Sequence, residues 1–390
     1  MLFQMVQNHL FLNDSLSLYM PSSNLTHTWD YQNPLQNIDV ECAHIWAAGK
    51  NLDSVCPFSL EEEWKKNQQK ISAFAKSFET VGVNISELDL VDIIPEKFLK
   101  KYLRNKNQIS EHVFGTFEKP TNYDFMLKLH QMIASISSRI LKLDYELLKF
   151  KSFNAQVRNF LKKAQNWRPR IVYNPYGTTT GRLGVQSGSF PILNWPRELR
   201  GAILPNNDCF LELDFNAAEL RVLLALNERE QPDIDIHDWN AKHIFKENLT
   251  RDEIKKKTFS WLYNPKSINK SLEMCYNKDY VLKKYFDGSH VNTIFDRKIE
   301  ADDHHALNYI VQSTTSDLFL KQAIKIWNIL KGKKTNVAFT IHDSLVLDFS
   351  LSDKKMVERL LEEFSNTELG KFKVNVSGGK NFGNMKKMDL

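Results

Sequence analysis

Two short strand patterns, each bringing an aspartate to a turn, constrain this fold more than any other feature. Phe210–Phe215 reads FLELDF and carries Asp214, while Val337–Asp343 reads VAFTIHD and ends in Asp343. The second pattern continues into SLVLDF, and its alternation around a central turn predicts a β-hairpin. A single aspartate at a strand end is usually a turn former or a helix cap. Two aspartates on adjacent strands can instead hold two divalent cations about 3.5–4 Å apart.

A helix pattern between Arg251 and Tyr263 supplies a third element. Arg251, Lys255, Phe259 and Tyr263 recur every four residues, so on a helix they lie on one face and span about 18 Å. Two cations followed by two aromatic rings suit a nucleoside triphosphate lying along the helix. An ordinary amphipathic helix with a basic start has the same pattern. Combined with the two aspartates, the pattern favours nucleotidyl transfer.

Composition sets only loose limits on function. The 390 residues, 42% apolar and 25% charged, are typical of a globular chain with more than one structural unit. The sequence contains no membrane-span pattern, and its N-terminus lacks the features of a signal peptide, so a cytoplasmic protein is expected. Four scattered cysteines without a C-x-x-C pair argue against a disulfide framework or a zinc site. The net charge of +5 is compatible with a nucleic-acid partner and equally with an ordinary surface.

The chain changes in texture along its length. Residues 1–58 are rich in Asn, Ser and Pro and show no sustained period. Ser59–Glu62 reads as a capping box that begins a helix, and a longer helical tract is predicted over about Tyr123–Lys163. Clusters of Lys and Arg at 100–106 and 162–170 flank this tract. They are consistent either with a solvated helix face or with contact to a phosphate backbone.

The order of these motifs resembles that of family A DNA polymerases, the bacterial DNA polymerase I type. The resemblance covers about residues 140–390 and includes motifs A, B and C of the family. Each segment alone is weak, but all of them in the family's order make coincidence very improbable. The matching segments are Thr180–Leu183 with Pro191–Pro196, Asp214–Arg221, Asp235–His237, Arg251–Tyr263, Asn308–Asp317, His342–Asp343 and Gly379–Phe382.

The resemblance implies an α+β right-hand polymerase fold with thumb, palm and fingers subdomains. The palm would be a small antiparallel sheet formed by two separate parts of the chain, and the thumb would be helical. The implied division is an N-terminal segment at 1–58, the thumb at 59–164, the palm at 165–225 and 306–390, and the fingers at 226–305.

The resemblance also implies template-directed addition of dNTPs to a primer 3′ end. Asp214 and Asp343 would hold two Mg²⁺ ions, and Lys255 would act in catalysis by protonating the departing pyrophosphate. Glu219 would close the space that a ribose 2′-hydroxyl needs, which favours a DNA polymerase. The implied nucleotide-binding residues are Arg251, Lys255, Phe259, Tyr263, His237 and Glu219. The residues implied to contact primer–template DNA are Arg182, Arg200, Arg221, Asn308, Gln312 and His342.

The sequence departs from the family at several positions. Ser344 follows the motif C aspartate where the family usually has Glu, so we expect a weaker grip on the second ion or the primer end. Ala217 and Ala218 are smaller than the usual residues, which predicts relaxed base selection. Phe259 lacks the Tyr hydroxyl that can replace a missing 3′-hydroxyl, which predicts discrimination against dideoxynucleotides. Asn264 stands where motif B normally has Gly.

The N-terminal segment leaves its own role open. Asp39-Val40-Glu41 has the D-x-E spelling that begins a 3′–5′ exonuclease, but too few residues precede the thumb for that domain, so proofreading is not expected. The segment is a remnant, a packing segment or a docking site for replication accessory proteins. Two rivals to the DNA polymerase remain, a single-subunit RNA polymerase-like enzyme and a non-catalytic DNA-binding module that retains the fold. The Asn, Lys and Ile content favours a viral or phage source, and thus the host-cell cytoplasm.

Overall fold

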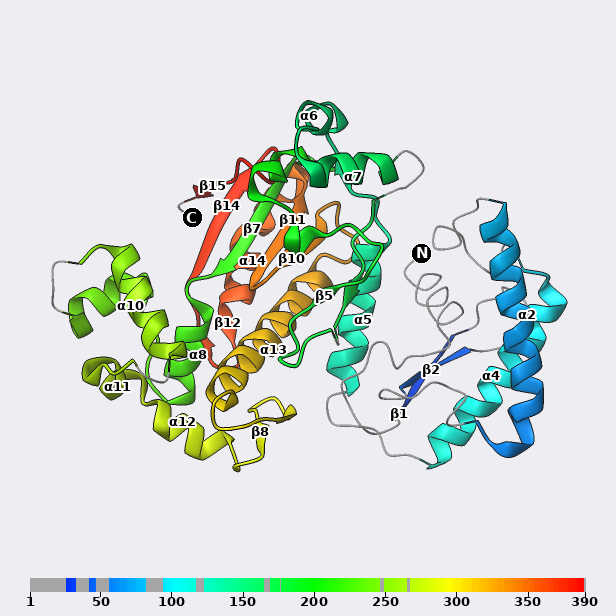
Figure 1. Ribbon diagram of the computed structural model, residues 1–390, viewed down its shortest axis with the longest axis horizontal. Helices are drawn as coiled ribbons and strands as arrows, with labels where there is room; N and C mark the ends of the chain where they lie inside the picture. The colour runs from blue at the N-terminus through cyan, green and yellow to red at the C-terminus, as the bar shows by residue number, and fades with distance from the viewer. Residues whose placement is uncertain are drawn as a thin grey trace. The chain divides into compact units, whose positions relative to one another are not determined.

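The computed structural model forms two compact units. One comprises Met1–Ser138 and Tyr173–Tyr176, and the other comprises Arg139–Val172 and Gly177–Leu390 (Figure 1). The Asp39-Val40-Glu41 motif lies outside the described residues. Among the described helices, none is long and apolar enough to cross a membrane. The described residues are 26–32, 42–46, 56–81, 94–116, 123–164, 169–175, 177–245, 249–264 and 267–388.

The first unit is mainly helical. Trp64 in its first long helix stacks on Tyr102 in the next at 5.4 Å between ring centroids, and both side chains are buried. The predicted helix start near Ser59 is confirmed, because a 3-10 turn leads directly into a helix whose first turn carries three glutamates. The elements are β1 (Thr26–Gln32), β2 (Cys42–Trp46), η3 (Phe58–Leu60), α2 (Glu61–Thr80), α4 (Glu96–Thr116), α5 (Tyr123–Ser137) and β4 (Tyr173–Asn174).

A five-stranded antiparallel sheet lies at the centre of the second unit. Its strand order is β10-β11-β7-β14-β15. The register places Ser344 of β11 and Asn375 of β14 on either side of Asp214. Both predicted strand patterns and the predicted hairpin are confirmed. The strands are β7 (Cys209–Phe215), β10 (Asn336–Ile341), β11 (Ser344–Phe349), β14 (Val374–Gly379) and β15 (Lys386–Met388).

Helices and short connecting elements complete the second unit (Figure 1). The mixture of antiparallel sheet and helices confirms the expected α+β class. The helices are α6 (Tyr145–Phe150), α7 (Ala155–Ala164), α8 (Ala218–Leu226), α9 (Ile236–Asn240), the π-helix η7 (Ala241–Phe245), α10 (Arg251–Tyr263), α11 (Lys270–Tyr276), α12 (Lys278–Tyr285), α13 (Ala306–Ile329) and α14 (Val357–Ser365). The short elements are β3 (Lys142–Leu143), β5 (Gly184–Val185), η5 (Ile192–Asn194), η6 (Arg197–Ala202), β6 (Ile203–Leu204), β8 (His290–Asn292), β9 (Lys298–Glu300), η8 (Leu351–Met356), β12 (Asn366–Thr367) and β13 (Gly370–Lys371).

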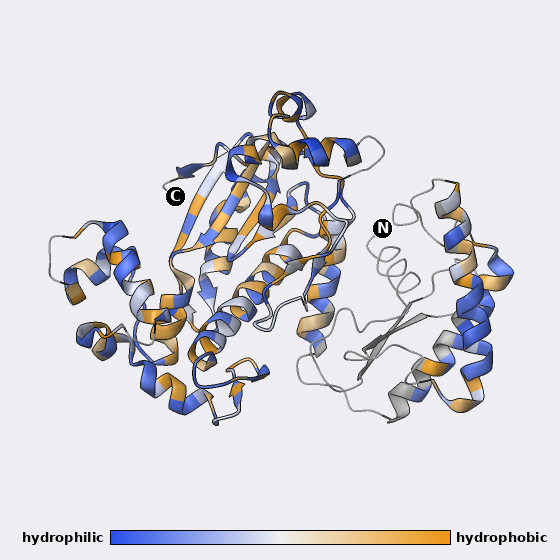
Figure 2. Ribbon diagram, viewed as in Figure 1, coloured by the Kyte–Doolittle hydropathy of each residue, from blue (hydrophilic) through white to orange (hydrophobic). Residues whose placement is uncertain are grey.

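Alternation along β7 separates an apolar face from a polar one. Leu213 and Phe215 are buried, and Phe215 stacks on Phe364 of α14 at 4.5 Å. Helix α13 packs against α14 and α8, so this face of the sheet forms the core of the unit. In Figure 2 the apolar residues of β7, β11 and α13 appear as orange bands. Because successive side chains of a strand point to opposite faces, Glu212 and Asp214 lie together on the other face.

The single helical tract predicted over Tyr123–Lys163 is wrong. The chain forms α5, α6 and α7 instead, and between the first two Lys142–Leu143 pairs with β6 as a short strand. Asp144 then begins α6, because its side chain accepts a hydrogen bond from the Leu147 amide at 2.9 Å. The boundary between the two units also falls between α5 and α6. The subdomain limits, including a thumb at 59–164, stay predictions.

Candidate active site

Asp214 and Asp343 lie at the same end of the sheet. Asp214 is near the end of β7, and Asp343 occupies the turn between β10 and β11, next to the residue that pairs with Asp214. The turns beside them contain Ala217 and His342 with left-handed backbone, at φ values of 49° and 51°. Residues with side chains rarely adopt this conformation, and such strain is concentrated at functional sites.

The environment of the two aspartates disfavours their negative charge. Burial raises the pKa of Asp214 to about 7, against a hydrogen bond that Asn375 donates at 3.3 Å, and the charges of Glu212 and Asp343 add to the rise. Burial also raises the pKa of Asp343 to about 6, against the charge of Arg182. Two carboxylates close together with little water are stabilised by a cation between them.

The donor atoms of this pair fit a divalent cation that prefers oxygen. Mg²⁺ commonly takes one or two protein carboxylates and fills its other positions with water and substrate phosphates. In the part of the chain that the structure describes, no group of three or more His, Cys, Asp or Glu side chains is placed to hold a metal ion. The oxygens of the aspartate pair suit such an ion, whose remaining positions would be filled by water and substrate.

Ser344 and Glu212 form a contact that the sequence motifs did not predict. The Ser344 hydroxyl donates a hydrogen bond to a Glu212 carboxylate oxygen at 2.6 Å, across the β11–β7 pair. Glu212 therefore places a third negative charge near Asp214, while Ser344 stands where the family usually has Glu. The spelling L-E-L-D predicts that Glu212 shares a face with Asp214, but only the strand register reveals its partner.

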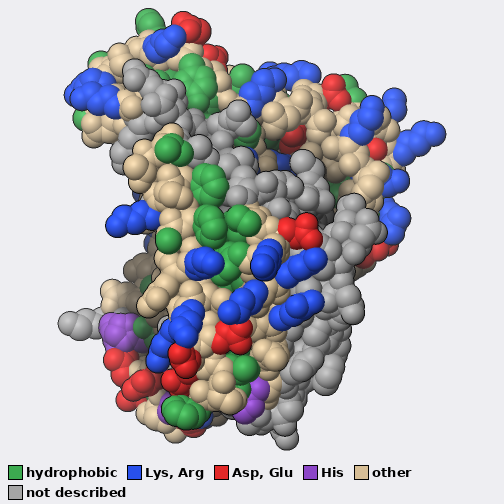
Figure 3. Space-filling view, turned by 90° about the vertical axis from the view of Figure 1, so that its right-hand side faces the viewer, with side chains coloured by type: hydrophobic (Ala, Val, Ile, Leu, Met, Phe, Trp, Pro, Cys, Tyr) green, Lys and Arg blue, Asp and Glu red, His purple; other side chains and the backbone are tan. Residues whose placement is uncertain are grey.

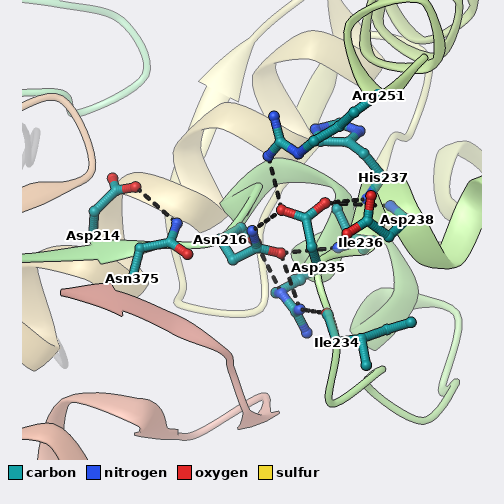
Figure 4. A network of polar contacts seen from close by, with 10 residues as sticks. Asp214, Asn216, Ile234, Asp235, Ile236, His237, Asp238, Arg251 and Asn375 are labelled. Atoms are coloured by element: carbon teal, nitrogen blue, oxygen red, sulfur yellow. Dashed lines mark hydrogen bonds and ion pairs between the residues drawn. The ribbon is translucent and has the colours of Figure 1, made fainter. Parts of the chain in front are cut away.

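Asp235 connects the loop after α8 to helix α10 (Figure 4). One of its carboxylate oxygens accepts hydrogen bonds from Asn216 at 2.8 Å and from Arg251 at 2.7 Å. The other accepts from the His237 amide at 2.8 Å and thereby caps α9. Although burial opposes the effect, the hydrogen bonds from Arg251 and Asn216 hold the pKa of Asp235 well below its usual range.

His237, the predicted triphosphate contact, is held at the start of α9. The residue is only 2% exposed, and its Nδ1 atom has no hydrogen-bond partner in the described part of the chain. Burial lowers the pKa of His237 to about 4, against the opposing charge of Asp235. The imidazole is thus neutral near pH 7 in this conformation.

Arg221 occupies a different place from the one predicted. Its side chain is fully buried, and its guanidinium donates hydrogen bonds to the Asn216 backbone oxygen at 2.8 Å and to the Ile234 backbone oxygen at 2.9 Å. A further bond at 2.8 Å reaches the Pro232 backbone oxygen. Because these bonds use its donors inside the protein, Arg221 supports the loop that carries Asp235. The prediction that Arg221 contacts DNA is therefore wrong.

Helix α10 presents the predicted row of cations and rings. Thr250 and Glu253 form a complete capping box at its start. Arg251 and Lys255 are exposed, and the Phe259 ring stacks on the exposed Tyr263 ring at 6.1 Å, while Ile254, Thr258, Trp261 and Leu262 are buried. The Phe259 ring also lies 6.1 Å from the His237 ring. The four residues therefore share a face that is open to a ligand.

Glu219 ties this helix to the glycine-rich turn before β5. Arg182 donates to one Glu219 carboxylate oxygen at 2.6 Å, and the Tyr263 hydroxyl donates to the other. Burial and the negative charge of Glu219 together raise the pKa of Tyr263. Gln312 of α13 also forms a hydrogen bond that acts on Tyr263. The structure thus brings together four residues that the motifs assigned to nucleotide or DNA binding.

Of the other predicted DNA-binding residues, His342 lies near Arg182 and Arg200, and Asn308 lies on α13. His342 is exposed, and burial of part of its ring together with the charges of Arg182 and Arg200 lowers its pKa. The Arg200 guanidinium lies 5.1 Å from the Phe382 ring. Asn308 is half-buried on α13, and none of the residues that the structure describes forms a hydrogen bond with its side-chain oxygen.

Comparisons with known proteins find similarity to DNA polymerases. No protein-family model matches the chain. It is 22% identical to DNA polymerase I of Borreliella burgdorferi (strain ATCC 35210 / DSM 4680 / CIP 102532 / B31), over 48% of this chain and 26% of the relative. It also matches the solved POL domain of Pol1 from M. smegmatis in complex with DNA primer-template and dNTP, with a TM-score of 0.50 and 14% identity. That match covers 83% of this chain and 66% of the other.

This chain shares the fold of the Pol1 polymerase domain. The resemblance read from the motifs is therefore confirmed at the level of fold and similarity. The chain spans about a quarter of the curated relative's length and about two thirds of the structural one's. A viral or phage source stays a prediction.

Proposed function

We propose that this chain is a DNA-directed DNA polymerase that extends a primer 3′ end with dNTPs. The observation that carries the proposal is the meeting of the two aspartates with the open face of α10. The charges of both Asp343 and Lys255 act on Asp214, so the carboxylate pair and the cationic helix face share one electrostatic environment. This is the combination that nucleotidyl transfer requires.

In the proposed reaction the primer 3′-hydroxyl loses its proton to solvent and its oxygen bonds to the α-phosphorus of a dNTP. The bond from the α-phosphorus to the bridging oxygen breaks, and pyrophosphate leaves. Asp214 and Asp343 would hold two Mg²⁺ ions, which would supply Lewis acidity to the attacking hydroxyl and the leaving group. Lys255 donates a proton to the departing pyrophosphate. Arg251 and His237 bind the triphosphate oxygens, for which Arg251 must exchange its ion pair with Asp235 for the phosphate.

Two positions determine which nucleotide is accepted in this proposal. Glu219, held by Arg182 and Tyr263, closes the space beside the sugar 2′-carbon and so favours dNTPs over rNTPs. Phe259 lies against the sugar and offers no hydroxyl, so the enzyme discriminates against dideoxynucleotides. The small Ala217 and Ala218 leave slack behind the nascent pair, which relaxes base selection.

Primer–template DNA is the proposed macromolecular partner. The primer end is contacted by Arg182, Arg200 and His342, and the charges of the two arginines act on the His342 ring. The template–primer duplex is contacted by Asn308 and Gln312 of α13. The same proposal includes the limits of the thumb, palm and fingers and a lack of 3′–5′ proofreading. It also includes binding of replication accessory proteins at residues 1–58 and a cytoplasmic location.

The test is extension of a labelled primer on a DNA template with Mg²⁺, using dNTPs or rNTPs, beside an Asp343→Ala variant. Extension with dNTPs alone, lost in the variant, is the expected result. Extension with rNTPs would move the chain to the RNA polymerase-like enzymes. Binding of primer–template without extension would identify a non-catalytic module and overturn the proposal.

A further inference from the structure

A broad groove runs between α2 and α4 in the first unit, separate in sequence from every candidate catalytic residue. It encloses about 1110 Å³, above the roughly 300–1,000 Å³ of ordinary small-molecule pockets. Five Lys and Arg side chains and two glutamates line it. Figure 3 shows Lys and Arg side chains gathered on this side of the molecule. The groove therefore suits an extended anionic ligand better than a small one.

Three of the five cations have no carboxylate partner among the described residues. Among the described residues, no Asp or Glu lies within ion-pair distance of Lys70, Lys97 or Arg104, and all three are exposed. The other two are only partly neutralised, since Lys100 pairs with Glu96 at 2.9 Å and Lys101 pairs with Glu63 at 3.3 Å. Lys97, Lys100, Lys101 and Arg104 recur at helical spacing, so one face of α4 is cationic.

The floor of the groove offers a ring and an unused amide donor. Phe74 is half-buried and lies 5.6 Å from the Phe98 ring, over which the Lys70 ammonium group sits at 5.1 Å. Asn105 is only 1% exposed, and its side-chain oxygen accepts a hydrogen bond from Asn67 at 3.3 Å. Its amide nitrogen has no partner among the described residues, which is costly for a buried donor unless a ligand supplies an acceptor.

We propose that this groove binds a single-stranded nucleic acid segment. Phosphates contact Lys70, Lys97 and Arg104, a base packs on Phe74, and the Asn105 amide donates to a ligand oxygen. A cationic groove with an accessible ring is the combination by which proteins bind single strands without sequence preference. An acidic peptide would use the charges but not the ring, and a duplex would present its phosphates without free bases. The site goes beyond the proposed polymerase chemistry and does not depend on it.

The test measures binding of a fluorescent dT12 oligonucleotide to the full chain by anisotropy, in EDTA, across a range of salt concentrations. The variant is Lys97→Glu with Arg104→Glu. Its matched control, Lys76→Glu with Lys128→Glu, makes the same charge change at exposed first-unit positions outside the groove. We expect at least ten-fold weaker binding in the variant alone, and a log–log salt slope that falls by about 1.4, the value for two lost phosphate contacts.

A second readout locates the oligonucleotide. An oligonucleotide carrying 5-iodouracil should crosslink under ultraviolet light to the peptide that contains Phe74, and Phe74→Ala should weaken binding about ten-fold. Equal binding by groove variant and control, or tighter binding of a duplex or of polyglutamate at this peptide, would overturn the proposal. Primer extension and the unfolding midpoint are followed in parallel. Loss of groove binding with intact extension separates this site from the catalytic one.

Discussion

Substitution of Asp235 should change the free energy of unfolding by an amount that can be estimated from its contacts. It accepts four hydrogen bonds, from the Asn216 amide, the Arg251 guanidinium and the backbone amides of His237 and Asp238. Asp235→Ala removes all of these acceptors at once. Asp235→Asn keeps an oxygen that can cap α9 but removes the negative charge.

The expected cost follows from these contacts. Loss of the helix cap contributes about 1 kcal/mol. Loss of the charge-assisted bond from the buried Asn216 contributes about 1–2 kcal/mol. The ion pair with Arg251 adds only about 0.5 kcal/mol, because the Arg251 side chain is 48% exposed and solvent screens the pair. Asp235→Ala should therefore lower the free energy of unfolding by about 2–4 kcal/mol, and Asp235→Asn by about 1–2 kcal/mol.

Urea unfolding followed by circular dichroism measures this free energy. Asp233→Ala is the matched control, since Asp233 is an exposed aspartate of the same loop and should change stability by less than about 0.5 kcal/mol. A cycle with Arg251→Ala should give a coupling energy near 0.5 kcal/mol. A loss below about 0.5 kcal/mol for Asp235→Ala would refute the structural role assigned to this network.

Four further predictions concern the candidate active site. His237 has a pKa of about 4 in the folded chain and about 6.5 when unfolded, so the unfolded state binds a proton first as the pH falls. The free energy of unfolding should therefore fall by about 2–3 kcal/mol between pH 6.5 and pH 4. Urea melts across this pH range should show that His237→Gln removes this component. Phe259→Tyr should raise dideoxynucleotide incorporation relative to dNTPs about ten-fold or more in a chain-termination assay, because the new hydroxyl supplies a hydrogen bond. Glu219→Ala should raise the rNTP-to-dNTP incorporation ratio about ten-fold, and an unchanged ratio would exclude Glu219 as the steric block. Glu212→Gln should weaken Mn²⁺ binding, followed by electron paramagnetic resonance, roughly five-fold, since it removes a charge beside the ligand pair; unchanged binding in Glu212→Gln would show that this charge does not act on the ion.

Local sequence patterns predicted several strands and helices of the fold. The alternation around Asp214 and Asp343 predicted the two strands and the hairpin because a half-buried strand requires that period. The four-residue spacing from Arg251 to Tyr263 predicted the open face of α10, because residues four apart lie on one side of a helix. These are properties of one segment at a time, so no tertiary information was needed.

Long-range partners could not be read in the same way. The Ser344–Glu212 contact depends on the register between β11 and β7, which no local pattern specifies. Arg221 looks like a surface cation in sequence, and only the fold shows that backbone oxygens surround it. The break before α6 did have a signal, since Asp144 is a good N-cap, but the apolar spacing on either side concealed it.

Asp214 and Asp343 are proposed to direct templated addition of deoxynucleotides. The most direct measurement is rapid-quench incorporation of one dNTP opposite each of the four template bases, comparing the natural chain with Asp214→Asn. We expect extension only with the complementary dNTP above a low background, and a loss of at least about 10³-fold in Asp214→Asn. Incorporation that ignores the template base, or that persists in Asp214→Asn, would contradict it.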